Sequence, residues 1–263
     1  MAISTIELDG IGATPITYSD RGAGRTFLLL HGGAGPQSVT GFADTLAAAA
    51  PGRVIVPAHP GFDGTPRPSD LADIPGLAAL YTRLLEELDL AGVTVIGNSM
   101  GGWIAAEMAV AGSARIADLI LVDAVGILVP GHPVADFFAL TLAQVADLSY
   151  HDPDRFRIDP ASMSTNQRAV MAGNRAALAA YAGTAMVDAS LGGRLGRVQV
   201  PALVVWGDSD RIVDPDYGLA FAAAIPGAQF RVLAATGHVP QLESPAELLA
   251  AVLDFTSARS AAG

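Results

Sequence analysis

The sequence contains no cysteine and few charged residues. Without cysteine, disulfide bonds, thiolate nucleophiles and cysteine metal ligands are excluded. Charged side chains make up 16% of the 263 residues and hydrophobic ones 51%, a balance that suits a sheet covered by helices. The net charge of −11 argues against binding to nucleic acid or to an anionic membrane, and we expect neither as a partner.

Membrane-spanning and targeting patterns are also missing. No uninterrupted apolar run approaches the roughly 18 residues needed to span a bilayer. The segment 1–7 has neither a basic region nor an apolar core, so it does not have the pattern of a signal peptide. Together with the lack of cysteine, these features predict a cytoplasmic protein.

Short apolar runs predict the strands of a sheet. Runs without alternation of polar and apolar residues are typical of strands buried on both faces of a parallel sheet. Five such runs follow one another, at 26–30, 53–56, 93–96, 119–122 and 202–206. A sixth, 229–233, is more polar and is expected nearer an edge. Segments 3–8 and 15–19 predict an opening antiparallel hairpin.

Helical sequence separates these runs. Leucines at helical spacing predict a helix over 77–88, a second helix is expected over about 40–50, and a last one begins near Pro245. The alternation predicts an α/β fold with a doubly wound, mostly parallel sheet.

One long segment interrupts this alternation. Residues 124–197 show no strand pattern, and after a start rich in proline and glycine they are largely helical. We predict an inserted helical cap over 124–197, with residues 1–123 and 198–263 forming the core. A cap that follows a strand would lie over the C-terminal edge of the sheet, where ligands bind in such folds.

The segment Gly97–Gly101 reads Gly-Asn-Ser-Met-Gly and lies between a strand run and alanine-rich helical sequence. A strand, a Gly-x-Ser-x-Gly turn and a helix form the pattern that exposes a nucleophilic serine at the top of a sheet. The two glycines remove Cβ atoms that would clash in so tight a turn. Ser99 is therefore the predicted nucleophile; the alternatives are a phosphate-binding loop or an ordinary turn.

A serine hydroxyl needs a base to take its proton, and the base needs an orienting acid. Among five histidines, His238 is the predicted base, because it follows the last strand run and so lies at the same sheet edge as Ser99. Asp210 is the predicted acid, since it follows the fifth run. Asp208 is closer to that strand and is suited to hydrogen bonding within the turn. Asp123, at the end of the preceding strand, stays open as the alternative acid.

The glycine-rich segment His31–Pro36 follows the first central strand and exposes backbone amides. A tetrahedral intermediate needs donors for its oxyanion, and we predict the amides of Gly33 and Met100 for this role. His31 is expected to hold the loop by hydrogen bonding. No Gly-Lys-Ser/Thr follows the glycines, which argues against a phosphate site. No histidine pair has metal-ligand spacing, so we expect no metal ion.

Five residues beside these groups are predicted to contact the substrate. Phe62 lies in a turn-rich loop after the second strand run, in which His59 is expected to be structural. The other four neighbour the predicted nucleophile, base or oxyanion donors, and they are Gly32, Asn98, Trp103 and Val239.

Together these segments resemble the α/β-hydrolase fold family over nearly the whole chain outside the cap. The resemblance rests on five motifs in the family's order, Leu30–Gly33, His59–Gly64, Gly97–Gly102, Trp206–Asp210 and Gly237–Pro245. It implies a serine hydrolase without a cofactor, in which Ser99, Asp210 and His238 follow the family's order of nucleophile, acid and base.

Within that family, Asn98–Gly102 and His31–Pro36 are similar to the meta-cleavage product hydrolases, which cut a carbon–carbon bond in vinylogous diketo acids. That group usually carries a tryptophan directly after the histidine base, where this chain has Val239. It also uses a cap arginine on the substrate carboxylate, for which Arg168 and Arg175 are the candidates.

The expected function is hydrolysis of a small, fairly apolar ester, lactone or related carbonyl compound. Carbon–carbon bond hydrolysis of meta-cleavage products is the alternative. Two further alternatives on the same fold are a ligand sensor that turns over little or not at all, and a perhydrolase or cofactor-free oxygenase-like enzyme. The expected partner is a small-molecule substrate, and formation of a homo-oligomer stays open.

Overall fold

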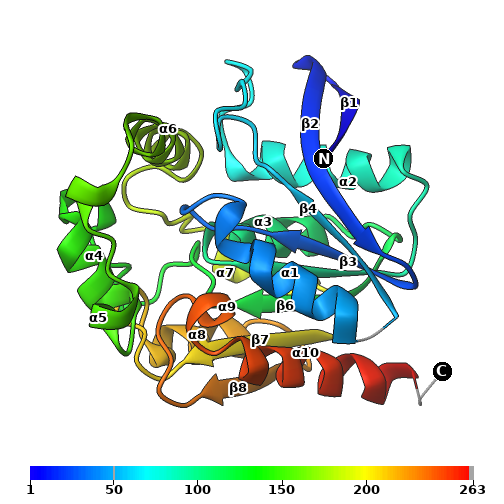
Figure 1. Cartoon of the computed structure of the whole chain (residues 1–263). Helices are drawn as coiled ribbons and strands as arrows, with labels where there is room; N and C mark the ends of the chain where they lie inside the picture. The colour runs from blue at the N-terminus through cyan, green and yellow to red at the C-terminus, as the bar shows by residue number, and fades with distance from the viewer. Residues whose placement is uncertain (50, 261–263) are drawn as a thin grey trace.

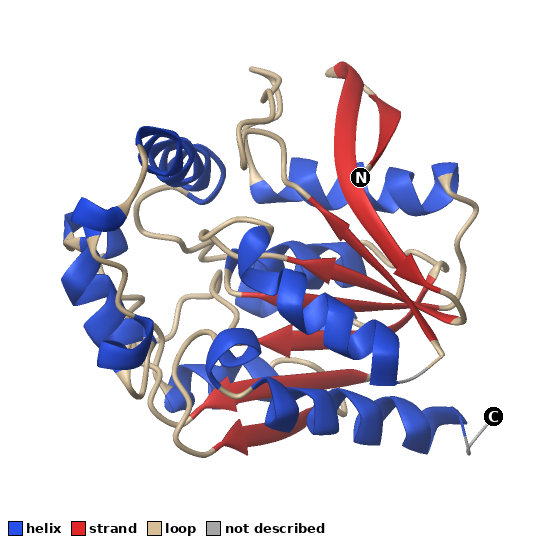
Figure 2. Ribbon diagram, in the orientation of Figure 1, coloured by secondary structure: helices blue, strands red, loops and turns tan. Residues whose placement is uncertain are grey.

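The computed structural model describes residues 1–49 and 51–260, and its centre is one eight-stranded sheet (Figure 2). The strands lie in the order β1-β2-β4-β3-β5-β6-β7-β8. All the strands that the sequence predicts are present, the opening hairpin included. They are Ala2–Leu8 (β1), Gly12–Gly22 (β2), Arg25–Leu30 (β3), Gly52–Pro57 (β4), Val93–Asn98 (β5), Ile116–Val122 (β6), Ala202–Gly207 (β7) and Gln229–Leu233 (β8).

The strands from β3 onward are parallel, and the hairpin extends the sheet at one edge. β2 pairs antiparallel with both β1 and β4. The remaining neighbours pair parallel to one another, from β4 across to β8. This confirms the predicted doubly wound, mostly parallel sheet. β8 forms the far edge, in agreement with its more polar sequence.

Helices cover both faces of the sheet (Figure 1). In β3, Phe27 and Leu29 belong to the hydrophobic core on one face, and Leu28 and Leu30 belong to the core on the other, because successive residues of a strand point to opposite faces. The first core is closed by α1 (Gln37–Ala49) and α10 (Pro245–Ser260). The second is closed by α2 (Ile74–Glu87), α3 (Met100–Val110) and α8 (Pro215–Ala223).

Local sequence determines where these helices begin. α2 follows Asp73, whose carboxylate accepts a backbone N–H of the first turn at 2.8 Å. Asp214 caps α8 in the same way, at 2.9 Å from the nitrogen of Tyr217. The helix predicted over 40–50 is α1, which begins three residues earlier, at Gln37; residue 50 lies outside the described residues.

Residues 124–197 connect β6 to β7 and consist of helices and turns. Within the described chain they form no strand of the sheet, apart from one isolated bridge between Gly126 and Val187. In Figure 1, α4, α5 and α6 stand beyond the C-terminal ends of the strands. The boundaries of this segment as a separate cap domain stay a prediction. Its elements are η1 (Phe137–Ala139), α4 (Leu142–Ser149), α5 (Pro153–Phe156), η2 (Pro160–Ser162), α6 (Thr165–Ala182), α7 (Leu191–Arg194) and η3 (Leu195–Arg197).

One cluster of charged side chains connects the end of segment 124–197 to the core. Glu107 of α3 is 5% exposed, and both of its oxygens accept from Arg194 of α7 at 2.6 Å. Arg194 also bonds to Asp188 at 2.6 Å. A buried carboxylate is costly without a cation, so this contact fixes α7 against α3. None of the helices in the described part of the chain is long and apolar enough to cross a membrane.

Candidate active site

Ser99 lies in the tight turn between β5 and α3, and its backbone is strained. Its φ of 53° falls in a region that residues other than glycine rarely adopt. A Cβ on Gly97 would lie 2.1 Å from the carbonyl oxygen of Gly101, and a Cβ on Gly101 would lie 2.2 Å from that of Leu30. The turn therefore requires both glycines of the motif, and it leaves Ser99 partly exposed.

Three side chains from different strand ends form one chain of hydrogen bonds. His238 Nε2 lies 2.9 Å from Ser99 Oγ, and His238 Nδ1 lies 2.8 Å from Asp210 Oδ2. Asp210 is buried, and its Oδ1 accepts the N–H groups of Ile212 and Val213 at 2.8 and 3.2 Å. With Asp210 as acceptor, Nδ1 carries the proton and Nε2 presents its lone pair to the Ser99 hydroxyl. The structure thus brings the predicted nucleophile, base and acid together.

The backbone of His238 is held from two sides. Its N–H donates to the carbonyl oxygen of Ser149 at the end of α4, at 2.7 Å. A Cβ on Gly237 would lie 2.2 Å from that oxygen, so glycine permits this close approach. The His238 carbonyl oxygen accepts from Asn98 Nδ2 at 3.1 Å, and Asn98 Oδ1 accepts from Gln241 of α9 (Pro240–Glu243). Asn98 is buried in this network and supports the histidine loop, and its contact with the substrate stays a prediction.

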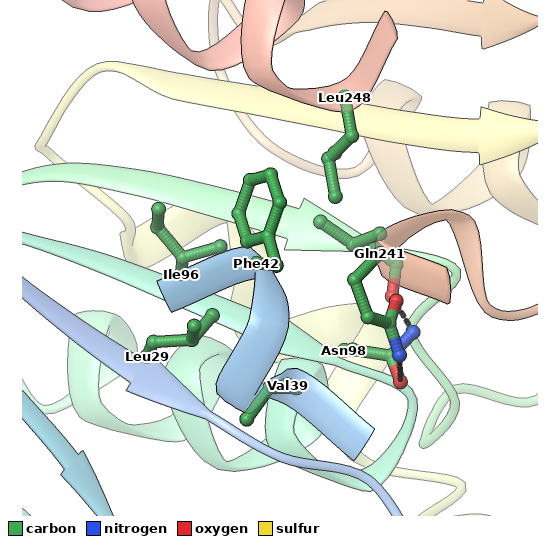
Figure 3. A pocket seen from close by; sticks show the side chains of 8 residues that line it. Leu29, Val39, Phe42, Ile96, Asn98, Gln241 and Leu248 are labelled. Atoms are coloured by element: carbon green, nitrogen blue, oxygen red, sulfur yellow. Dashed lines mark hydrogen bonds between the residues drawn. The ribbon is translucent and has the colours of Figure 1, made fainter. Parts of the chain in front are cut away.

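A small cavity lies behind this loop, between the sheet and helices α1 and α10 (Figure 3). Its volume is about 10 Å³, roughly the space that one water molecule needs, so it does not admit a substrate. Gln241 Oε1 is buried and has no hydrogen-bond partner among the described residues. The cavity is lined by Leu29, Val39, Phe42, Ile96, Asn98, Val122, Gln241 and Leu248.

The glycine-rich loop after β3 packs directly on Ser99. A Cβ on Gly32 would lie 3.0 Å from Ser99 Cβ. The N–H groups of Gly33 and Met100, the predicted oxyanion donors, donate to no acceptor within residues 1–49 and 51–260. Met100 is the first residue of α3, and a helix N-terminus favours negative charge.

Two buried histidines join this loop to the next one. The His59 N–H donates to His31 Nε2 at 3.1 Å, so the proton of His31 is on Nδ1, which donates to the Gly32 carbonyl oxygen at 2.7 Å. His59 Nε2 donates to the His31 carbonyl oxygen at 2.9 Å, and its Nδ1 accepts from the Tyr81 hydroxyl at 2.6 Å. Burial lowers the pKa of His31 well below its usual value and lowers the pKa of His59 to about 4. Both rings are therefore neutral at pH 7.

This network makes the stability of the fold sensitive to acid. Above about pH 6.5 the His59 ring is neutral in both the folded and the unfolded chain, so its contribution is fully present. As the pH falls toward 4, only the unfolded chain binds the proton, and stability is lost. Between pH 7.5 and 4.5, the stability advantage of the wild type over His59→Gln is expected to shrink by about 2–3 kcal/mol.

Urea unfolding of both proteins at the two pH values measures this change. The comparison with His59→Gln cancels the contributions of titrating groups that do not contact His59, such as the buried Asp123. A stability difference that is the same at both pH values would contradict the neutral, buried state of His59.

Of the five residues predicted to contact the substrate, four are buried and Val239 is partly exposed. Phe62 has no exposed surface and packs edge-on against the rings of His31 and His59, at 5.1 and 5.6 Å. It therefore supports the loop and does not line an open pocket, contrary to expectation. Trp103 is 4% exposed, and its indole Nε1 has no partner among the described residues.

Helix α6 contacts the loop that follows β3 and the loop that follows β4. Asn174 Oδ1 accepts the N–H of Asp63 at 2.8 Å, and Asn174 Nδ2 donates to the carbonyl oxygen of Ala34 at 3.2 Å. Leu178, one turn further along the helix, lies against Gly33, since a Cβ there would be 2.8 Å from Leu178 Cδ2. One amide side chain thus connects the loop after β3, the loop after β4 and α6.

Asn174→Ala is expected to loosen both loops. It leaves one N–H and one carbonyl oxygen without their partner, which is expected to cost about 1–2 kcal/mol in the free energy of unfolding. We also expect kcat to fall while KM changes little, because the Gly33 amide is no longer held in place.

Asn166→Ala is the matched control, because Asn166 lies on the same helix and is exposed. It is expected to change neither quantity. Urea unfolding and steady-state kinetics of both variants test this, and equal effects of the two substitutions would remove the connecting role of Asn174.

Asp123, the alternative acid, lies beside the same pair. One carboxylate oxygen each of Asp123 and Asp210 and one ring nitrogen of His238 all lie within 4.8 Å of one another. No other set of three potential metal ligands occurs in the part of the chain that the structure describes. Asp123 Oδ1 accepts the N–H of Gly207 at 2.9 Å, whereas His238 Nδ1 bonds to Asp210. The structure therefore pairs the histidine with Asp210.

A model of the alpha/beta hydrolase family matches residues 27–252, most of the chain. The chain belongs to the alpha/beta hydrolase family. The resemblance inferred from its motifs is confirmed, and the protein is a hydrolase.

Two relatives match this hydrolase over almost its full length. A 2-hydroxy-6-oxononadienedioate/2-hydroxy-6-oxononatrienedioate hydrolase of Cupriavidus pinatubonensis is 29% identical, across 94% of this chain and 92% of its own. A 2-hydroxy-6-oxo-6-(2'-aminophenyl)hexa-2,4-dienoic acid hydrolase of Metapseudomonas resinovorans is 27% identical, across 95% of this chain and 90% of its own.

Solved structures have the same fold. A thermophilic esterase from Thermogutta terrifontis superposes with a TM-score of 0.77 at 26% identity, covering 98% of both chains. A meta-cleavage product hydrolase from Pseudomonas fluorescens IP01 superposes with a TM-score of 0.78 at 19% identity, covering 97% of this chain and 98% of its own. At that identity the second similarity shows the fold alone.

Several supporting residues are not found by sequence reasoning. Tyr81 lies on the leucine-rich face of its helix and has the pattern of a core residue, although its hydroxyl bonds to His59. Ser149 and Asn174 lie in the helical segment without any motif. Gln241 falls within the last family motif, so that motif was the one available signal for it.

Proposed function

We propose that this hydrolase uses Ser99 as a nucleophile on the carbonyl carbon of a small substrate. The observation that supports the proposal most is the continuous chain of hydrogen bonds from Ser99 through His238 to Asp210, at 2.9 and 2.8 Å. A base at this distance from a hydroxyl is in reach of its proton. A buried acid behind the base holds the ring and stabilises the imidazolium that forms.

The proposed reaction has two stages. His238 Nε2 takes the Ser99 proton while Oγ bonds to the carbonyl carbon, and the N–H groups of Gly33 and Met100 stabilise the oxyanion. The bond to the leaving group then breaks, and the imidazolium gives its proton to that group. In the second stage His238 takes a proton from water, the water attacks the acyl-enzyme, and Ser99 is released with its proton restored.

The substrate class that we favour is a 2-hydroxy-6-oxo-dienoate, in which the leaving atom is carbon. Both relatives named above are hydrolases of such compounds. Conversion of the dienol to its keto form allows the leaving carbon to accept the electron pair of the broken bond. These relatives favour carbon–carbon bond hydrolysis over the ester or lactone substrate expected from the sequence. Ester hydrolysis is the second candidate, supported by the similarity to the thermophilic esterase.

Arg175 is the proposed partner of the substrate carboxylate. Its Nη2 donates to the carbonyl oxygens of Phe137 and Phe138 at 3.1 and 2.8 Å, and its guanidinium carbon lies 4.9 and 5.1 Å from their ring centres. The guanidinium is therefore held in place before any substrate binds, so little side-chain freedom is lost on binding. Arg168, the other candidate, is exposed, and it donates to the carbonyl oxygen of Met163, which lies just before the start of α6.

Substrate comparison tests this proposal. A 2-hydroxy-6-oxo-dienoate, p-nitrophenyl butyrate and a small lactone are assayed with the wild type, Arg175→Met and the matched control Arg168→Met. The dienoate is expected to be the best wild-type substrate. Arg175→Met is expected to raise its KM about 10- to 100-fold, the cost of a lost charged hydrogen bond. Arg175→Met is expected to leave the KM for the neutral ester unchanged. Arg168→Met is expected to change the KM of neither substrate.

Turnover of the ester with none of the dienoate would establish the second candidate in place of the first. Tight binding of either compound without turnover would contradict the hydrolase mechanism proposed for Ser99.

A further inference from the structure

The carboxyl group of Asp123 is completely buried beside Asp210, and no proposed reaction step uses it. Its Oδ1 accepts the N–H of Gly207 at 2.9 Å. Its Oδ2 is buried and has no hydrogen-bond partner among the described residues. A carboxylate oxygen buried without a donor is costly, so this atom requires an explanation.

The charged and titratable groups around Asp123 do not favour a second negative charge. Asp210 faces it from the loop after β7, His238 from the loop after β8, and Glu243 from α9. Burial, followed by the negative charges of Asp210 and Glu243, raises the pKa of Asp123 well above its usual value. Glu243 is itself bonded to the N–H of Gly237 at 2.6 Å.

The two aspartates differ in how many donors they face. Asp210 accepts three hydrogen bonds, from His238 Nδ1 and from the N–H groups of Ile212 and Val213. Asp123 accepts one, from Gly207. When two carboxyl groups share a buried site and only one of them ionises, the charge stays where the donors are most numerous. The smaller number of donors at Asp123 therefore favours the proton on that residue.

We propose that Asp123 is a neutral carboxylic acid whose Oδ2–H group donates to Asp210, making it a positioning residue for the acid behind His238. Both oxygens of Asp123 then have partners, one as an acceptor and one as a donor. His238 faces one negative charge in place of two, and the proton of Asp123 fixes the position of that charge. The inference rests on the role proposed for Asp210.

Infrared spectroscopy of the intact protein tests the protonation directly. Exposed carboxyl groups are ionised at pH 7.5, so a carbonyl stretch of a protonated carboxyl group at that pH reports a buried acid. We expect this band in the wild type and its loss in Asp123→Asn. The matched control is Asp208→Asn, since Asp208 is exposed and begins the same loop as Asp210; it is expected to keep the band. A wild-type spectrum without the band, or an Asp123→Asn spectrum that retains it, would overturn the proposal.

The pH dependence of kcat/KM supplies a second reading. The Asn amide is neutral and keeps both a donor and an acceptor, so the acid limb of Asp123→Asn is expected to coincide with that of the wild type. If Asp123 were ionised, the loss of a negative charge near His238 would move that limb by about one to three pH units. Should Asp123→Asn not fold, a wild-type spectrum without the band at pH 7.5 would still overturn the proposal. The spectra need no turnover, so they test the inference even if the proposed reaction fails.

Discussion

Ser99→Ala is expected to lower kcat by about a millionfold for the dienoate and for esters, because the members of such a hydrogen-bonded set act as a unit. Without the hydroxyl, His238 has no proton to take, and no acyl-enzyme forms. Substrate binding and the two backbone donors remain, so a small residual rate above that in water is expected. KM is expected to change much less than kcat, since the methyl group of alanine fits where the serine methylene lies.

Ser209 offers a matched control for this substitution. Like the Ser99 hydroxyl it bonds to a histidine, at 2.8 Å from His151 Nδ1, but unlike Ser99 it also bonds to an aspartate, at 2.8 Å from Asp208 Oδ1. The Ser209 proton is donated to Asp208, so the histidine is a donor here and does not activate the hydroxyl. Ser209→Ala is expected to leave kcat unchanged. Near wild-type kcat in Ser99→Ala would remove Ser99 from the mechanism.

Asp210→Asn is expected to lower kcat by about ten-thousandfold with little change in the fold. An Asn side chain presents its NH₂ group to His238 Nδ1. The ring then adopts the tautomer with its proton on Nε2, which has no lone pair for the Ser99 hydroxyl. Asp123→Asn is expected to keep most of its activity, because the amide still accepts from Gly207 and donates to Asp210.

Kinetics and thermal unfolding of the two variants, side by side, separate catalysis from stability. Asp214→Asn is a suitable control, because Asp214 also bonds to a histidine: its Oδ2 lies 2.8 Å from His132 Nδ1. Asp214 caps the start of α8, and asparagine caps helices equally well. The reverse order, with Asp123→Asn far less active than Asp210→Asn, would assign the acid role to Asp123.

The sheet was predictable because its strands are buried on both faces. Leu28 and Leu29 point to opposite sides of β3, and both must be apolar, so the strand is a continuous apolar run. Ser99, His238 and Asp210 were predictable for a related reason. Each follows a parallel strand, and the C-terminal ends of parallel strands meet at one edge of the sheet.

Contacts between segments far apart in the chain were not predictable. Phe62 and Asn98 are predicted from the sequence to contact the substrate, yet both side chains are buried and support a loop. Asn174 bonds to residues 111 and 140 positions away, and nothing in its own helix distinguishes it from the exposed Asn166. The choice between Asp123 and Asp210 depended on which of two buried carboxyl groups lies 2.8 Å from the histidine ring.

The substrate was the least predictable part, because the residue that we propose as the partner of its carboxylate lies in the helical segment between β6 and β7. Arg175 and Arg168 are equivalent in the sequence, and only the contacts of Arg175 with Phe137 and Phe138 distinguish it. Those contacts join η1 to α6, two elements without a shared motif.

Covalent labelling tests the central claim most directly. The folded protein is treated with a small fluorophosphonate, digested, and its modified peptide identified by mass spectrometry. We expect one adduct, on Ser99, formed rapidly in the wild type and far more slowly in His238→Ala, because the reaction needs the base that takes the Ser99 proton. An active wild-type enzyme that carries no adduct on Ser99, or one that is labelled equally fast without His238, would contradict this account.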